Sequence, residues 1–186
     1  MMKIDRALRW VLFALLGVLA LAGCAAPQPV DDGKIIEYRS EKFGFRVSHP
    51  AQWQVLEDPQ PLVGDNPIDL HAVAFLPGQE TKTLIAVWIQ TLTTTQTLDE
   101  YVGQQMTSMQ NNEVNAQFSD PTPTHLGGLN ALATRATVTA TNPATLERVI
   151  LVINGRQGYG MTFYGPPEGD TVQAFEALMQ SFAFLP

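Results

Sequence analysis

The stretch that decides the fold is Tyr38-Arg-Ser-Glu-Lys-Phe-Gly-Phe-Arg-Val-Ser-His-Pro-Ala-Gln-Trp53. In its middle, Phe-Gly-Phe-Arg-Val alternates apolar residues with glycine or a polar residue, which predicts a strand over residues 43–49 with one apolar face. Pro50 is expected to end this strand, because proline has no N–H for the hydrogen-bonding ladder. Trp53 follows the bend, where its large ring can close one end of a hydrophobic core.

The composition is that of one globular domain with an acidic surface. The chain has 186 residues, 45% of them apolar, and a net charge of −7. Residues 1–23 hold three of the 11 basic and one of the 18 acidic side chains, so the rest of the chain carries −9. An acidic surface is repelled by phosphate backbones, which argues against a nucleic-acid partner. It argues equally against docking on anionic lipid through a basic patch.

The N-terminus has the pattern of an export signal. Residues 1–9 include three basic side chains, and residues 10–22 form an unbroken apolar run of 13 residues. That run has the length of a signal-peptide core and is shorter than the ~20 residues that a spanning helix needs. The alternative is an uncleaved signal anchor with an incidental cysteine.

The run ends in Leu21-Ala22-Gly23-Cys24, which resembles the lipobox of bacterial lipoproteins. The resemblance implies cleavage before Cys24, the single cysteine of the chain, and alkylation of its thiol with diacylglycerol. Acyl chains contribute about 0.8 kcal/mol per buried methylene, so two or three of them hold a protein firmly to a bilayer. We therefore expect a signal peptide over 1–23, a lipidated tether over 24–34, and a cell-membrane protein that faces the extracytoplasmic side.

The remaining chain, residues 35–186, is predicted to form a single domain of strands and two helices. Strands are expected at 35–39, 43–49, 54–57, 68–76, 82–91, 114–118, 129–141, 145–154 and 159–164. A capping box at Thr97-Leu-Asp-Glu100 predicts one helix to about residue 110, and a second box at residues 170–173 begins a terminal helix. Because short turns join most strands, the sheet is expected to be largely antiparallel, with the helices laid on it.

Two motifs resemble those of PsbP-like domains. One is the opening Phe43-Gly-Phe…His-Pro-Ala-Gln-Trp53, and the other is Leu126-Gly-Gly-Leu-Asn-Ala131, with Gly127 and Gly128 in a hairpin turn. The resemblance implies an α+β fold, an α/β/α sandwich with a central antiparallel sheet. Its members are mostly non-catalytic binding or assembly proteins. The matched residues, Pro50, Trp53, Gly127 and Gly128, are structural, so no catalytic residue is carried over.

A search for catalytic motifs leaves few candidates. None of the five serines lies in Gly-x-Ser-x-Gly or Ser-x-x-Lys, and the histidines have no metal-binding spacing. Asp65, Asp69 and His71 are the best candidate metal ligands, although a solvated strand face explains them more simply. The glycines of residues 155–160 predict a turn rather than a phosphate loop. We expect no cofactor and no metal.

Two further groups have a structural explanation and a functional one. Glu147 and Arg148 are expected to form a surface pair on a strand rather than an acid–base site. Trp53 and Trp88 could line a ligand pocket with Tyr159 or Tyr164, but core packing is the simpler interpretation.

Three functions remain open. The first is a lipid-anchored module that binds an envelope protein or a small ligand without turning it over. The second is an envelope enzyme whose site is assembled from distant residues, such as His49, Asp69 and His71. The third is a purely structural envelope protein, for which a large exposed apolar patch and self-association would speak.

Overall fold

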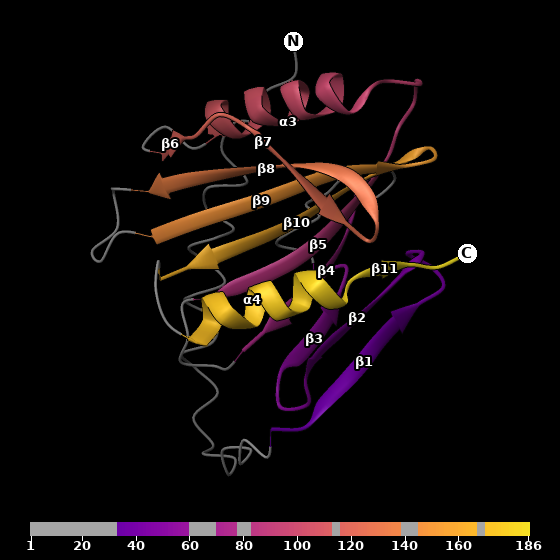
Figure 1. The fold of residues 1–186 in the computed structure, drawn as a ribbon, viewed down its shortest axis with the longest axis vertical. Coiled ribbons are helices and arrows are strands. Elements are labelled where there is room, and N and C mark those ends of the chain that lie inside the picture. Colours follow the sequence, from indigo (N-terminus) through magenta and orange to yellow (C-terminus); the bar gives the residue numbers. More distant parts are fainter. Residues whose placement is uncertain (1–32, 60–69, 78–82, 113–115, 139–144, 167–169) are drawn as a thin grey trace.

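The structure is a computed structural model that describes residues 33–59, 70–77, 83–112, 116–138, 145–166 and 170–186. Most strands form one antiparallel sheet of eight strands, in the spatial order β3-β4-β5-β10-β9-β8-β6, with β7 also paired to β8 (Figure 1). They are β3 (Gln54–Glu57), β4 (Leu70–Leu76), β5 (Leu84–Thr91), β6 (Ala116–Phe118), β7 (Thr122–Leu126), β8 (Leu129–Val138), β9 (Thr145–Asn154) and β10 (Gln157–Gly165). This confirms the predicted central antiparallel sheet.

A second sheet of three strands lies beside the first. It contains β1 (Ile35–Ser40), β2 (Phe45–Pro50) and β11 (Ala183–Phe184). The sequence predicted neither a separate sheet nor β11, because two residues carry no readable alternation. Tertiary contacts place β11: the Leu185 N–H donates to the Gly44 carbonyl at 2.9 Å, and the Phe182 ring stacks on Phe45 with centroids 5.2 Å apart.

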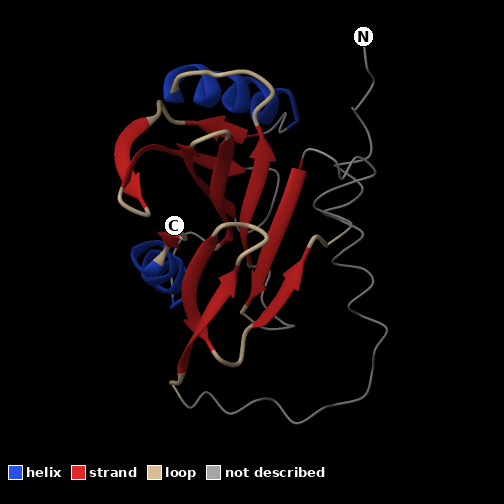
Figure 2. Ribbon diagram, turned by 90° about the vertical axis from the view of Figure 1, so that its right-hand side faces the viewer, coloured by secondary structure: helices blue, strands red, loops and turns tan. Residues whose placement is uncertain are grey.

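The two described helices lie on opposite faces of the large sheet (Figures 1 and 2). They are α3 (Leu98–Asn112) and α4 (Asp170–Ser181). The predicted capping box begins α3: the Thr97 N–H donates to Glu100 Oε2 at 2.7 Å, and the Glu100 N–H donates to Thr97 Oγ1 at 3.3 Å. No helix among the described residues is long and apolar enough to cross a bilayer.

Each face of the large sheet has its own core. Alternate residues of β9 make this plain: Ile150 and Val152 pack toward α4, whereas Val149 and Leu151 pack toward α3. The α4-side core is the larger and also buries the small sheet, with the aromatic side chains Phe43, Phe45, Trp53, Phe75, Tyr159, Phe163, Phe175 and Phe182. The small sheet therefore forms part of the layer that covers this face together with α4.

The opening stretch differs from its prediction in one detail. Strand β2 begins at Phe45, two residues later than expected, because Gly44 has a φ of +70° and belongs to a tight turn. The Phe43 side chain is nevertheless buried in the α4-side core. Pro50 is the last residue of β2, and Trp53 is only 8% exposed.

The double glycine joins β7 to β8 in a two-residue hairpin. Gly127 and Gly128 have φ values of +58° and +82°. A type I′ turn needs positive φ at both positions, which is unfavourable for residues that have a Cβ. At Gly127 space is also limiting, because an added Cβ would lie 2.6 Å from a ring carbon of Phe184. The turn thus holds the C-terminal segment as well as the hairpin.

The second glycine-rich segment is mostly strand, where the sequence predicted a turn. Only Gly155 and Arg156 form the turn between β9 and β10, and β10 starts at Gln157. Gly158 and Gly160 lie on the α3 side of β10, directly beneath two rings. An added Cβ would lie 2.4 Å from the Tyr101 ring at Gly158 and 2.1 Å from the Trp88 ring at Gly160. These glycines let the aromatic side chains lie flat on the sheet.

Candidate functional site

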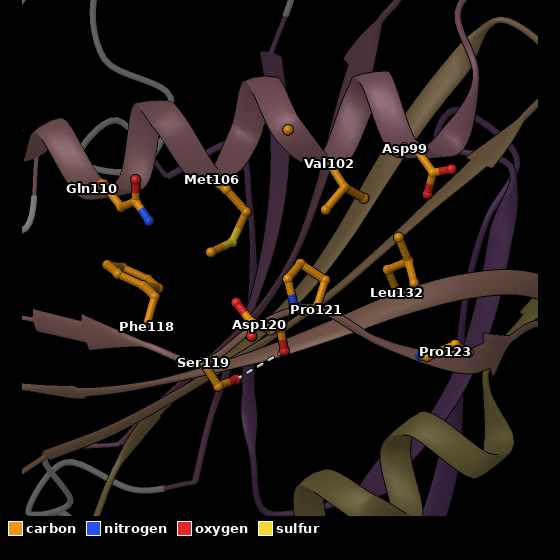
Figure 3. A pocket seen from close by; sticks show the side chains of 11 residues that line it. Asp99, Val102, Met106, Gln110, Phe118, Ser119, Asp120, Pro121, Pro123 and Leu132 are labelled. Atoms are coloured by element: carbon orange, nitrogen blue, oxygen red, sulfur yellow. Dashed lines mark hydrogen bonds between the residues drawn. The ribbon is translucent and has the colours of Figure 1, made fainter.

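A groove of about 480 Å³ lies between α3 and the sheet edge made by β6 and β7, and we call it the α3 groove (Figure 3). The helix contributes Asp99, Val102, Gly103, Met106 and Gln110, and the opposite side contributes Phe118, Ser119, Asp120, Pro121, Pro123 and Leu132. In Figure 3 the Val102 and Met106 side chains extend from the helix toward Phe118, Pro121 and Leu132. The middle of the groove is therefore apolar.

A β-bulge shapes the lower wall of the groove. Phe118 pairs with Ala136 and Thr122 pairs with Ala133, so three residues of the edge face two residues of β8. Ser119 fixes this extra residue, because its N–H donates to the Arg135 carbonyl at 2.8 Å and its carbonyl accepts from the Thr134 hydroxyl at 2.8 Å. The bulge brings Asp120 and Pro121 to the groove.

The charged side chains among the described lining residues of the groove all have one sign. Asp99, in the first turn of α3, and Asp120, in the bulge, are the only ionisable residues in that described lining. The recorded ion pairs of the described residues include neither of them. Ser119 and Gln110 supply the remaining polar side chains. The arrangement suits an occupant that is apolar in its middle and positively charged.

A second polar cluster lies at the other end of the large sheet and consists of Lys42, Asp58 and His71. Lys42 Nζ lies 2.7 Å from Asp58 Oδ2, and His71 Nδ1 donates to Asp58 Oδ1 at 3.1 Å. The Ala72 N–H donates to the same carboxylate at 3.1 Å. Asp58 has a φ of +43°, the one positive value among the described residues other than glycine. The cluster joins the β1–β2 turn to β4.

The hydrogen bonds of this cluster control the charge of Asp58. Burial alone would raise the pKa of Asp58, but the bonds from Lys42, the Ala72 N–H and His71 together hold its pKa below the ordinary value. The carboxylate is therefore charged at neutral pH and has donors on both oxygens. We interpret the cluster as a polar contact that connects the β1–β2 turn of the small sheet to β4 of the large sheet.

We predict that Asp58→Asn lowers the free energy of unfolding by about 1 kcal/mol at neutral pH and by much less in acid. Because the folded-state pKa is depressed, the stabilisation is full above the ordinary value of about 3.9 and is lost as the pH falls through the folded-state pKa. Asparagine tolerates the left-handed backbone, so the substitution isolates the charge.

Urea unfolding followed by circular dichroism, at about pH 7 and about pH 2.5, measures this difference. Asp120→Asn is the matched control, since no recorded ion pair involves that carboxylate. An Asp58→Asn effect of equal size at both pH values would show that the charge of Asp58 does not stabilise the fold.

Of the residues considered for a metal cluster and for a distant-residue enzyme site, the structure describes only His49 and His71. Asp65 and Asp69 lie outside the described residues, and His71 pairs with Asp58. His49 is 3% exposed, donates from Nδ1 to the Pro50 carbonyl at 2.9 Å and packs on Phe75, and burial lowers its pKa. Within the described ranges, no group of three His, Cys, Asp or Glu side chains could hold a metal ion.

The aromatic pocket considered for Trp53 and Trp88 is not formed. Trp53 belongs to the α4-side core and Trp88 packs into the α3-side core, so the sheet separates them. Tyr159 is buried with Trp53, and its hydroxyl lies 3.0 Å from the Phe43 carbonyl. These side chains pack in the two cores, which was the simpler interpretation.

Of the expected surface pair of Glu147 and Arg148, the structure shows that Arg148 makes a contact between elements. Arg148 makes an ion pair with Glu176 of α4, and its guanidinium lies 5.2 Å from the centre of the Phe175 ring. Neighbouring residues of a strand point to opposite faces, so Arg148 reaches the helix from the face that α4 covers. Cys24 lies outside the described residues.

Comparisons with known proteins identify the architecture. No protein-family model and no curated protein matches the chain by sequence. Among solved structures, the chain is similar to the cyanobacterial PsbP (CyanoP) of Synechocystis sp. PCC 6803, with a TM-score of 0.57 and 15% identity over 89% of this chain and 99% of that one. The fold is PsbP-like.

Two other solved structures are similar to parts of this PsbP-like fold. A protein of Bacteroides thetaiotaomicron VPI-5482 has a TM-score of 0.55 and 10% identity over 81% of this chain, which spans about half (48%) of that protein's length. LpqN of Mycobacterium tuberculosis, described as involved in cell envelope biogenesis, has a TM-score of 0.49 and 12% identity over 82% of this chain and 91% of that one. At such identities a likeness shows the fold alone.

Sequence reasoning missed the α3 groove. Its two walls come from residues 99–110 and 118–132, and no strand was predicted between residues 118 and 129, where the structure has β7. The signal that could have found it is the phase of the apolar residues: Val102 and Met106 share a helix face, and Phe118 and Leu132 lie on neighbouring strands.

Proposed function

We propose that this protein is a lipid-anchored, extracytoplasmic PsbP-like module that binds an envelope protein in the α3 groove without turning it over. The observation that carries the proposal is the groove itself: it lies at a sheet edge and combines the apolar side chains Val102, Met106 and Phe118 with the carboxylates of Asp99 and Asp120. Binding sites of this kind combine apolar lining residues with a few placed polar groups. The PsbP-like fold and the lipobox support the same function.

The anchor is tested with Cys24→Ser. Without the thiol no diacylglycerol can attach, so the variant should lose its acyl label and move from the detergent phase to the aqueous phase in partitioning. Ala25→Ser, the matched control, should keep both. Native protein that carries no acyl label and retains residues 1–23 would show that an uncleaved signal anchor holds the protein instead.

The binding function is tested by capturing the tagged, lipidated protein from its native membrane and identifying bound proteins by mass spectrometry. Met106→Glu places a charge in the apolar middle of the groove and should abolish capture of the specific partner. Ser108→Glu adds the same charge at an exposed position of the same helix and should leave capture unchanged. A partner retained by Met106→Glu would place the binding site elsewhere and overturn the proposal.

A further inference from the structure

We infer that the ligand of the α3 groove is an extended polypeptide segment in which lysine or arginine is flanked by apolar residues. The inference rests on the proposed binding function and names the chemistry of the segment that the groove accepts. Three observations support it: the sign of the groove's charges, its length and apolar middle, and the donor-poor edge that forms one wall.

The first observation is the unmatched negative charge. Asp99 on the helix and Asp120 in the bulge line the groove, and no basic side chain is found among its described lining residues (Figure 3). Neither carboxylate belongs to a recorded ion pair of the described residues. A lysine or arginine between them would be attracted from both sides, and the overall charge of −7 would attract a basic segment over a longer range.

The second observation is the size of the α3 groove. Its helical wall runs from Asp99 to Gln110, and the 11 steps between these residues span about 17 Å at 1.5 Å per residue. An extended chain covers that distance with about five residues. Between the two ends lie Val102, Met106, Phe118, Pro121 and Leu132, which offer contact for aliphatic or aromatic side chains. A small amine would meet the charges but leave most of this apolar surface in contact with water.

The third observation concerns the edge. Within the described part of the chain, β6 and β7 pair with no strand other than β8. Residues 119–123 include Pro121 and Pro123, which have no N–H, so main-chain acceptors outnumber donors in this segment. A donor-rich occupant complements such an edge, and arginine and lysine carry five and three side-chain donors. An extended segment can lie beside an open edge without rearranging the sheet.

The test uses a displayed library of random 12-residue peptides, selected against the lipidated protein in nanodiscs. We expect the enriched peptides to carry lysine or arginine flanked by apolar residues. One enriched peptide is then synthesised and its Kd is measured for three variants. Asp99→Asn with Asp120→Asn should weaken binding about tenfold, and Met106→Glu should abolish it.

The matched control is Asp170→Asn with Glu41→Gln. This pair removes the same charge, and Asp170 also lies in the first turn of a helix, but neither residue lines the groove. The control should change the Kd less than twofold, because a surface charge remote from the bound peptide is largely screened. Raising the salt from about 0.05 M to about 0.5 M should weaken binding to the native protein and have less effect on the Asp99→Asn, Asp120→Asn variant.

The possible outcomes distinguish a wrong ligand class from a wrong binding function. Enriched peptides that are acidic or uncharged, no enrichment, or a Kd that the two Asp→Asn changes leave unaltered would each overturn the inferred ligand class. If Met106→Glu still abolished capture from the membrane, the α3 groove would remain the binding site for a different ligand. If Met106→Glu changed neither capture nor peptide binding, the proposed function and the inference would fail together.

Discussion

Replacing Phe45 with alanine is expected to lower the free energy of unfolding by about 3–5 kcal/mol. The side chain is fully buried in the α4-side core. Its ring stacks on Phe182, 5.2 Å away, and also packs 5.7 Å from Tyr38. Alanine would leave a cavity where β1, β2 and the C-terminal segment meet. Because β11 pairs with β2 at Phe45, the loss should also loosen the C-terminus.

Chemical denaturation measures the change in stability, and amide hydrogen exchange of residues 183–185 measures the loosening. Ile35→Ala is the control, since Ile35 belongs to the same small sheet but is 59% exposed, and it should change stability by less than about 0.5 kcal/mol. Equal effects of Phe45→Ala and Ile35→Ala would mean that the small sheet does not depend on this core.

Replacing Gly160 with alanine is expected to lower the free energy of unfolding by about 1–3 kcal/mol, although alanine suits a strand better than glycine does. The added Cβ would lie 2.1 Å from two ring carbons of Trp88. To make room, the indole must leave the sheet and give up the 3.1 Å hydrogen bond from its Nε1 to Thr162 Oγ1. The α3-side core would then be disturbed beneath Tyr101.

The same substitution at Gly103 should change the free energy of unfolding in the opposite direction. Gly103 is an exposed residue within α3, and a Cβ there would meet nothing within 4 Å. Alanine is the better helix former, so Gly103→Ala should raise the free energy of unfolding by about 1 kcal/mol. Thermal unfolding compares the two variants, and the near-ultraviolet circular dichroism of Trp88 should change in Gly160→Ala alone. If Gly103→Ala lowered the free energy of unfolding, a Cβ at this position would not lie in open space as the structure indicates.

Many of the helices and strands were predictable because local sequence patterns determine them. β9 occupies the predicted residues 145–154, and α3 begins at Leu98, directly after the first residue of the predicted capping box, Thr97. Alternating apolar residues and turn-forming glycines decide such elements within a few residues of sequence. The expected antiparallel order followed from short connections, which leave neighbouring strands little choice but to pair.

The sequence could not show which strands join which sheet. β2 alternates as any strand of a central sheet would, yet it pairs with β1 and with β11, whose two residues carry no periodicity. The stacking of Phe182 on Phe45 and the pairing of Phe184 with Phe45 place that segment, and Phe45 lies more than 100 positions earlier in the chain. For the same reason the sequence did not show why Gly158 and Gly160 are glycines: the rings of Tyr101 and Trp88 that require them lie on other elements.

The candidate site was less predictable than the fold. Searching for motifs led to histidines and aspartates, whereas the groove combines ordinary residues such as Met106, Phe118 and Leu132. What makes them a site is that α3 and the edge formed by β6 and β7 line the same groove from opposite sides (Figure 3). The bulge at Ser119 depends on hydrogen bonds to Thr134 and Arg135 of another strand, so no local pattern announces it.

By itself the sequence determined the local elements, the antiparallel order of the strands and the resemblance to PsbP-like domains, and it predicts the lipid anchor at Cys24. Each of these depends on periodicity, turn chemistry or a short motif, which neighbouring residues encode. The tertiary structure alone decided the division into two sheets, the pairing of His71 with Asp58 and the groove between Asp99 and Asp120. These depend on contacts between distant residues, whose relative positions exist only after the cores have packed.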